Sequence, residues 1–205
     1  MSERSNGGRA AAIGCRAHTG WAAFVVVGGS IPRPDVILRR RVELRDPTGQ
    51  VRPNAFQRAR SLDLPAAAEL VAAAERIALE RATVALEETS REVADVGAVV
   101  GSCAVVVGAS HDAPLESILA SHALAHAAEG RLYEHALLQG AESDALTAVA
   151  VPKRSIWERG EETLGVAADD LRVWIDQLRR ELGPPWAEDQ KLAALAAWIA
   201  LAPSS

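Results

Sequence analysis

Residues 11–27 read AAIGCRAHTGWAAFVVV, two apolar segments separated by a short polar turn. Residues 11–15 and 21–27 are each long enough for a β-strand. Thr19 and Gly20 supply the turn between them, because glycine admits the positive φ that tight turns need. This stretch predicts a β-hairpin.

A third strand is expected over residues 36–44 (VILRRRVEL), after a turn that contains Gly28 and Gly29. Short connections join antiparallel strands, so three consecutive strands predict an antiparallel meander. Residues 46–53 hold two prolines and a glycine and are typical of a loop.

Helices alternate with two further strands in the remaining chain. Residues 98–107 are rich in valine without alternation, which is typical of a central strand covered on both faces. Apolar residues at helical spacing mark most of the other segments. We expect helices over residues 65–95, 114–140, 166–182 and 188–201, a short helix or turn over residues 155–165, and a last strand over residues 147–151.

This order predicts an α/β fold with a mixed sheet flanked by helices. Later strands that are reached through a helix join the sheet in parallel by right-handed crossovers. The sheet should therefore hold a three-strand antiparallel meander plus two parallel strands, an order that resembles the ribonuclease H-like topology. We expect a disordered leader over residues 1–10 and a single domain over residues 11–205.

Composition indicates a folded, cytoplasmic protein. Hydrophobic residues make up 49% and charged residues 24% of the 205 residues. No apolar run reaches the roughly 18–20 residues that a membrane span needs, and no secretory signal is seen, so no membrane partner is expected. The two cysteines, Cys15 and Cys103, lack metal-ligand spacing and read as buried thiols on strands. They form a redox pair only if their strands are neighbours.

Charge is unevenly distributed along the chain. Residues 1–60 hold 11 Lys/Arg against 4 Asp/Glu, whereas the remainder is strongly acidic and brings the whole chain to −5. Such asymmetry indicates either a basic face for polyanions or two complementary faces that pair within or between chains.

Four segments, in matching order, resemble the RuvC-type Holliday-junction resolvases. Residues 13–22 (IGCRAHTGWA) resemble the first hairpin of that family, and residues 125–130 (AHAAEG) its helical A-R-G segment. Residues 149–153 (VAVPK) resemble a strand that ends in proline and a basic residue, and residues 189–196 (DQKLAALA) the closing helix. The common order of these segments carries the resemblance.

The resemblance implies a site of several carboxylates that holds two metal ions. The aspartate of the first strand falls at Cys15 or Arg16, and the glutamate after the fourth strand falls near Gly108, where Asp112 is the nearest acid. On the closing helix, Asp189 matches one of two aspartates. Since one acid of four is retained, we expect the two-metal site to be missing and no cofactor to be bound.

A second possible metal site consists of His122, His126 and Glu129, which share one face of a helix at i, i+4 and i+7. The alternative is that these side chains make hydrogen bonds where the helix packs on the sheet. If catalysis remains, Asp189 and Glu129 are the candidate catalytic residues.

Basic side chains suggest anion or nucleic-acid binding. The candidates are Arg16, His18, Arg39, Arg41, Lys153 and Arg154. Alternatively, the arginines of the third strand protect a sheet edge or pair with the acidic helix over residues 69–95, and Arg16 pairs with Asp189.

Three functions follow. The first is a non-catalytic RuvC-like domain, a homodimer, that binds nucleic acid through the basic N-terminal meander, or binds a protein. The second is a divergent metal-dependent nuclease. The third is a structural or assembly dimer with an interface of tryptophans, unless these belong to the core; they are Trp157, Trp174, Trp186 and Trp198.

Overall fold

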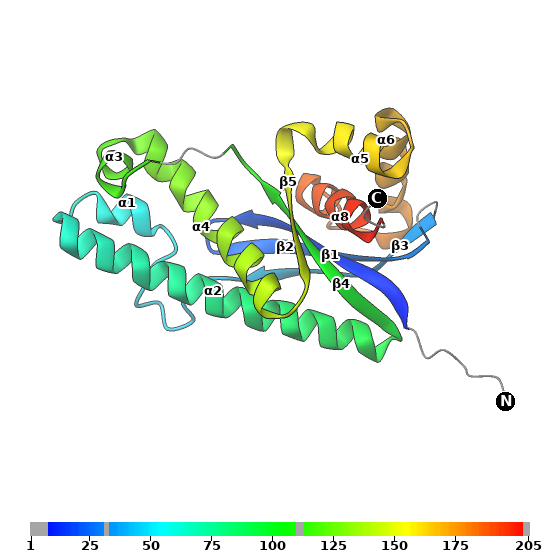
Figure 1. Ribbon diagram of the computed structural model, residues 1–205, viewed down its shortest axis with the longest axis horizontal. Coiled ribbons are helices and arrows are strands. Elements are labelled where there is room, and N and C mark those ends of the chain that lie inside the picture. Colours follow the sequence, from blue (N-terminus) through cyan, green and yellow to red (C-terminus); the bar gives the residue numbers. More distant parts are fainter. Residues whose placement is uncertain (1–7, 31–32, 110–112, 203–205) are drawn as a thin grey trace.

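The computed structural model describes residues 8–30, 33–109 and 113–202, which form an α/β fold around one five-stranded sheet (Figure 1). The strand order is β3-β2-β1-β4-β5. The first three strands are antiparallel, whereas β4 is parallel to β1 and β5 is parallel to β4. The strands are β1 (Arg9–His18), β2 (Trp21–Ser30), β3 (Arg33–Glu43), β4 (Ala98–Val107) and β5 (Thr147–Pro152). The predicted mixed sheet is confirmed.

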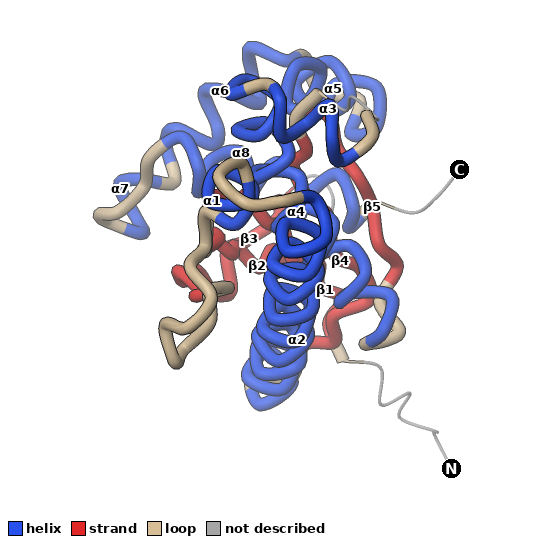
Figure 2. The backbone as a smooth tube through the Cα atoms, turned by 90° about the vertical axis from the view of Figure 1, so that its left-hand side faces the viewer, coloured by secondary structure: helices blue, strands red, loops and turns tan. Residues whose placement is uncertain are grey.

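Helices cover both faces of the sheet (Figures 1 and 2). In both views the long α2 lies at the bottom, and α5 and α6 lie at the top. The helices of one core are α1 (Ala55–Ala59), α2 (Leu64–Asp95), α3 (Leu115–Ala120) and α4 (His122–Ser143). Those on the other side are α5 (Ile156–Leu164), α6 (Ala168–Gln177), α7 (Arg179–Leu182) and α8 (Glu188–Leu201), with the 3-10 turn η1 (Lys153–Ser155) after β5.

β1 lies in the middle of the sheet, and its residues alternate between the two cores. Ile13 and Cys15 belong to the core under α2 and α4, whereas Ala12 belongs to the core under α8. A Cβ atom on Gly14 would lie 1.8 Å from the carbonyl oxygen of Ala193, so only glycine lets α8 rest on the strand. The hairpin turn places Gly20 at φ +81°, as the sequence predicts.

Several element boundaries differ from the predicted ones. β1 begins at Arg9, inside the predicted leader, whose residues 1–7 lie outside the described chain. The helix predicted over residues 114–140 is interrupted at Ser121, whose side chain accepts a hydrogen bond from Leu124 N and begins α4 as its N-cap. The helix predicted over residues 166–182 is interrupted at Leu178. The short α1 was not predicted, because five residues do not establish a helical period.

The two cysteines lie on neighbouring strands, with 3.7 Å between their Sγ atoms. Both are free and fully buried, and burial raises the pKa of Cys15 well above its usual value. A protonated thiol is a poor nucleophile, so the buried-thiol interpretation fits the geometry.

The tryptophans mostly belong to the core beneath α8. Trp186 and Trp198 are buried, and Trp186 Nε1 donates to Ile175 O at 2.8 Å. Trp157 and Trp174 are partly buried against the same core, which favours the core interpretation over an interface. No helix in the described ranges has the length and apolar character to cross a bilayer.

Candidate functional site

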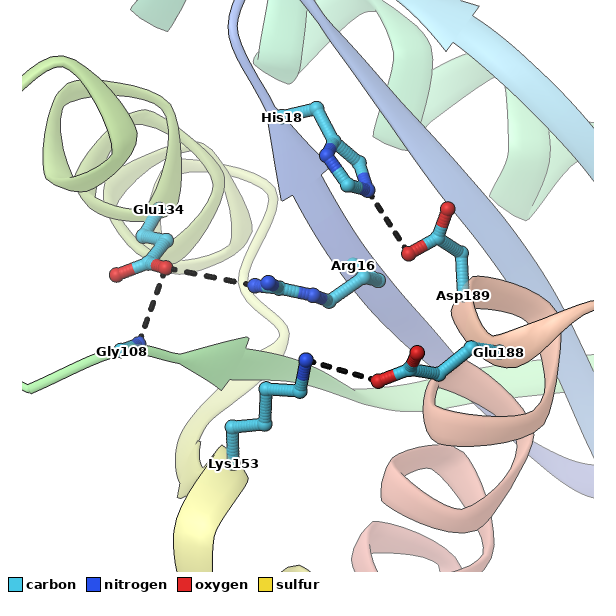
Figure 3. Close-up of polar contacts among 7 residues, drawn as sticks. All are labelled: Arg16, His18, Gly108, Glu134, Lys153, Glu188 and Asp189. Carbon is cyan, nitrogen blue, oxygen red and sulfur yellow. Dashed lines mark hydrogen bonds and ion pairs between the residues drawn. The ribbon is translucent and has the colours of Figure 1, made fainter. Parts of the chain in front are cut away.

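Charged side chains gather where the carboxyl ends of β1, β4 and β5 meet the first turn of α8 (Figure 3). Parallel strands end at the same edge of a sheet, and that edge is where open α/β sheets usually bind ligands. We call this group the carboxyl-edge cluster; its members are Arg16, His18, Glu134, Lys153, Glu188 and Asp189.

Arg16 lies near the end of β1, and its guanidinium faces the carboxylate of Glu134 on α4, with Nη1 at 3.7 Å from Oε1. Both side chains are largely buried, at 17% and 8% exposure. Arg16 Nε is buried without a hydrogen-bond partner in the described chain. The Arg16 side chain therefore holds a fixed positive charge with one donor unused.

Glu134 also accepts a hydrogen bond from the backbone N of Gly108, at 3.1 Å, directly after β4. Burial raises the pKa of Glu134, and the Gly108 N–H and the Arg16 charge oppose that rise. A carboxylate thus stands at the end of β4 although the sequence has no acid there, because α4 supplies it from across the edge.

His18 and Asp189 form the second pair, with 2.8 Å between Nε2 and Oδ1. The His18 ring stacks on Trp21 with 4.3 Å between centroids and 11° between planes. The guanidinium carbon of Arg41 lies 3.9 Å from the Trp21 ring centroid. The His18 ring is therefore held by stacking as well as by its carboxylate partner.

Lys153 and Glu188 form the third pair, with 2.8 Å between Nζ and Oε1, and both are well exposed. Lys153 lowers the pKa of Glu188. Glu188 and Asp189 lie in the first turn of α8, where the helix dipole favours carboxylates. The cluster thus holds three basic and three acidic side chains in three pairs.

The structure brings four sequence-predicted residues, Arg16, His18, Lys153 and Asp189, to this edge. Arg16 pairs with Glu134, so the pairing with Asp189 that the sequence suggested is wrong, since His18 takes that carboxylate. Arg154 lies beside Lys153 in η1 and is exposed.

Sequence reasoning missed Glu134 and Glu188. Glu188 was visible as the acid beside Asp189, at the expected start of a helix. Glu134 has no such signal, because only the packing of α4 brings it to the end of β4.

The predicted arginines of β3 lie elsewhere and already have partners. Arg39 donates to the carbonyl oxygens of the segment before α8, at 2.9 Å to Gly183 and 3.3 Å to Pro184, with further bonds to Leu182 and Pro185. Arg41 Nε donates to Glu43 at 2.9 Å. The neighbouring Arg40 pairs with Glu92 of α2, as one alternative predicted. Anion binding by Arg39 and Arg41 stays a prediction.

The structure does not bring His122, His126 and Glu129 together. Glu129 is buried and its Oε2 accepts from Gln57 N at 3.4 Å, at the start of α1. His122 Nδ1 lies 3.2 Å from Arg60 Nη1, and His126 is exposed. In residues 8–30, 33–109 and 113–202, no three His, Cys, Asp or Glu side chains form a group that could hold a metal ion.

The two candidate catalytic acids, Glu129 and Asp189, have different partners and do not form one site. Burial raises the pKa of Glu129 to about 7, and its partners are backbone N–H groups of α1 rather than members of the cluster. Asp189 is bound to His18. Asp112, the acid nearest to Gly108 in sequence, lies outside the described residues.

Comparisons with known proteins identify the fold. No protein-family model and no curated protein matches the sequence. Two solved structures are similar in fold. RuvC of T. thermophilus in complex with a Holliday junction substrate has a TM-score of 0.51 and 10% identity, covering 92% of this chain and 90% of that one. Thermus thermophilus RuvC has a TM-score of 0.50 and 12% identity, covering 92% of each chain. The fold is therefore ribonuclease H-like and RuvC-like.

Proposed function

We propose that this chain is a RuvC-like domain that binds nucleic acid at the carboxyl-edge cluster and does not cleave it. The observation that carries the proposal is the Arg16 side chain, a guanidinium fixed by Glu134 at one of the two positions, residues 15 and 16, where the resemblance implies a metal-binding acid. One of the similar structures holds a Holliday junction substrate, which favours nucleic acid over other polyanions.

The residues at this edge do not suit a pair of hard metal ions. Such ions need several carboxylate oxygens free to coordinate them. Here each of the three carboxylates already faces a basic side chain. Metal ions placed among them would also meet the positive charges of Arg16 and Lys153, which repel cations. The cluster, with its acids paired in this way, therefore disfavours metal-assisted hydrolysis.

The same basic groups suit phosphate oxygens. Lys153 is 45% exposed, and Arg154 is exposed beside it with no ion pair in the described chain. Arg16 adds a fixed positive charge at the same edge. Lys and Arg bind phosphates whatever the base sequence, and their binding weakens steeply with salt. The expected ligand is thus a nucleic-acid backbone rather than a particular base.

The three acids at one edge favour a second candidate, the divergent metal-dependent nuclease. For that function Glu134, Glu188 and Asp189 must exchange their basic partners for a cation.

The expected homodimer stays a prediction, which sedimentation velocity checks.

The test measures binding and cleavage on the same four-way DNA junction and on duplex DNA. Fluorescence anisotropy compares the wild type with the double variant Lys153→Gln, Arg154→Gln, for which we expect about tenfold weaker binding and a smaller salt dependence. Arg91→Gln is the control for loss of a basic side chain away from the cluster. Arg91 is exposed near the end of α2 that precedes β4, and so lies toward the amino end of that strand, whereas the cluster lies at the carboxyl end.

Cleavage is assayed with magnesium and with manganese, and none is expected. Cleavage that Asp189→Asn abolishes would overturn the non-catalytic proposal and establish the nuclease. Equal DNA binding by the double variant and the Arg91→Gln control would remove nucleic acid as the partner of this edge.

A further inference from the structure

A second basic region lies in the loop that follows β3. Residues 45–53 and α2 enclose an open hollow of about 550 Å³, within the roughly 300–1,000 Å³ range of ligand pockets. Three arginines line it, Arg45, Arg52 and Arg81, and we call it the arginine hollow. It is separate from the carboxyl-edge cluster and shares no residue with it.

Arg81 is the central observation. It comes from the middle of α2, and its Nε is buried with no hydrogen-bond partner in the described chain. Buried donors in folded proteins are nearly always paired, with protein, water or ligand. Neither Arg81 nor Arg52 takes part in an ion pair within the described residues.

The two acids in the lining already have partners. Glu43 accepts from Arg41 Nε at 2.9 Å and pairs with Arg45 Nε at 3.0 Å. Asp46 accepts hydrogen bonds from Thr48 N and Val51 N, both at 2.8 Å, and these bonds lower the pKa of its carboxyl group. The acids are thus engaged, and two guanidinium groups are left for a ligand.

The hollow is held in shape by contacts at both ends of the loop. Tyr133 Oη donates to Pro53 O at 2.8 Å, and Leu44 N donates to Gly20 O at 2.8 Å. A loop tied in this way does not have to be ordered by its ligand, which lowers the entropy cost of binding.

We propose that the arginine hollow binds a phosphate group, held by Arg52 and Arg81 through charge-assisted hydrogen bonds. Guanidinium groups match phosphate oxygens in both charge and fork geometry. The phosphate belongs either to a small phosphate ester or to a nucleic-acid backbone, and the hollow has room for more than the phosphate itself. The proposal goes beyond the carboxyl-edge function and does not depend on it.

Inorganic phosphate is the first probe, titrated into the full chain by isothermal titration calorimetry. Arg52→Gln and Arg81→Gln should each weaken binding by about tenfold, since each removes a charge-assisted hydrogen bond. Arg76→Gln is the matched control, because Arg76 is exposed on the same helix and does not line the hollow. Arg52 is itself exposed, so its variant stays informative if Arg81→Gln fails to fold.

A nucleoside 5′-phosphate and duplex DNA then separate the two sources of phosphate. If the mononucleotide binds more tightly than the duplex and Arg81→Gln weakens that binding, the ligand is a small phosphate ester. If the duplex binds more tightly in the same Arg81-dependent way, the ligand is a nucleic-acid backbone. If no probe binds, or if Arg76→Gln weakens binding as much as Arg52→Gln and Arg81→Gln, the proposal is wrong. Lys153→Gln should leave phosphate binding here unchanged, so failure of this proposal and failure of the carboxyl-edge proposal are distinguishable.

Discussion

The carboxyl-edge cluster and the arginine hollow both contain basic side chains beside the sheet, but they differ in whether those side chains have a carboxylate partner. At the edge, each basic member of the cluster has its own carboxylate: Arg16 has Glu134, His18 has Asp189 and Lys153 has Glu188. In the hollow, the two acids already have partners, whereas Arg52 and Arg81 take part in no ion pair within the described residues. Charge counts along the sequence therefore do not locate an anion site, because a cation that already has a carboxylate partner attracts an anion less. At the edge, the cation without an ion pair in the described chain is Arg154, beside the cluster.

The largest effect is expected from Glu134→Ala, which leaves the Arg16 guanidinium partly buried and unpaired. Removing one member of a buried ion pair costs about 3–5 kcal/mol, and the slight exposure of Arg16 places the expected loss of unfolding free energy near the lower end, about 3 kcal/mol. Urea unfolding measures it. Glu134→Gln keeps an acceptor for Gly108 N but not the charge, so it should lose less than Glu134→Ala and still be less stable than the wild type. A negligible loss in Glu134→Gln would show that the charge of Glu134 is not what holds Arg16.

A pH-dependent effect is expected from Glu129, a carboxyl that is buried as Glu134 is but faces backbone N–H groups instead of a guanidinium. Its pKa is raised from 4.5 to about 7, so the folded state keeps a proton that the unfolded state releases. Stability should therefore fall as pH rises from about 4.5 to 7, by about 2–3 kcal/mol, and then level off.

Glu129→Gln cannot ionise, so it should match the wild type near pH 4.5 and exceed it at pH 8. Unfolding in urea at both pH values checks this. An equal difference at both pH values would mean that Glu129 does not titrate in this range.

A smaller effect, of opposite sign, is expected in the hollow. Arg81→Met removes a buried donor that has no partner and keeps an apolar side chain of similar length, so stability without ligand should rise by up to about 1 kcal/mol. Added phosphate should then raise the melting temperature of the wild type more than that of the variant. A loss of stability in Arg81→Met without phosphate would show that Arg81 has a structural role.

The smallest effect is expected from Lys153→Met at the exposed end of the carboxyl-edge cluster. Exposed ion pairs contribute about 0–1 kcal/mol, and both members of this pair are well exposed. Urea unfolding should show almost no change, while DNA binding falls. A large loss of stability would indicate that the edge is held together by its ion pairs.

The hairpin of residues 11–27 made most of the fold predictable, since its turn glycine and apolar strands fix the meander from which the other strands continue. The same reasoning singled out Arg16, His18, Lys153 and Asp189 as candidate site residues, each at the end of a strand or the start of a helix, and the structure brings them to one edge. The local sequence pattern predicts that a helix forms, but not which distant strand its side chains contact. That is why Glu134 and its bond to Gly108 were missed, and why Arg16 was paired with the wrong acid.

Gly14 separates the placement of the edge from its chemistry. α8 packs closely on β1 through the missing side chain of Gly14, next to Ala193, and its first turn also contacts β1 through the His18–Asp189 pair. The close contact at Gly14 does not involve the side chains of the carboxyl-edge cluster, so we expect substitutions in the cluster to leave it in place. Introducing an acid at residue 16, together with removal of Lys153, would test whether the edge then binds a cation.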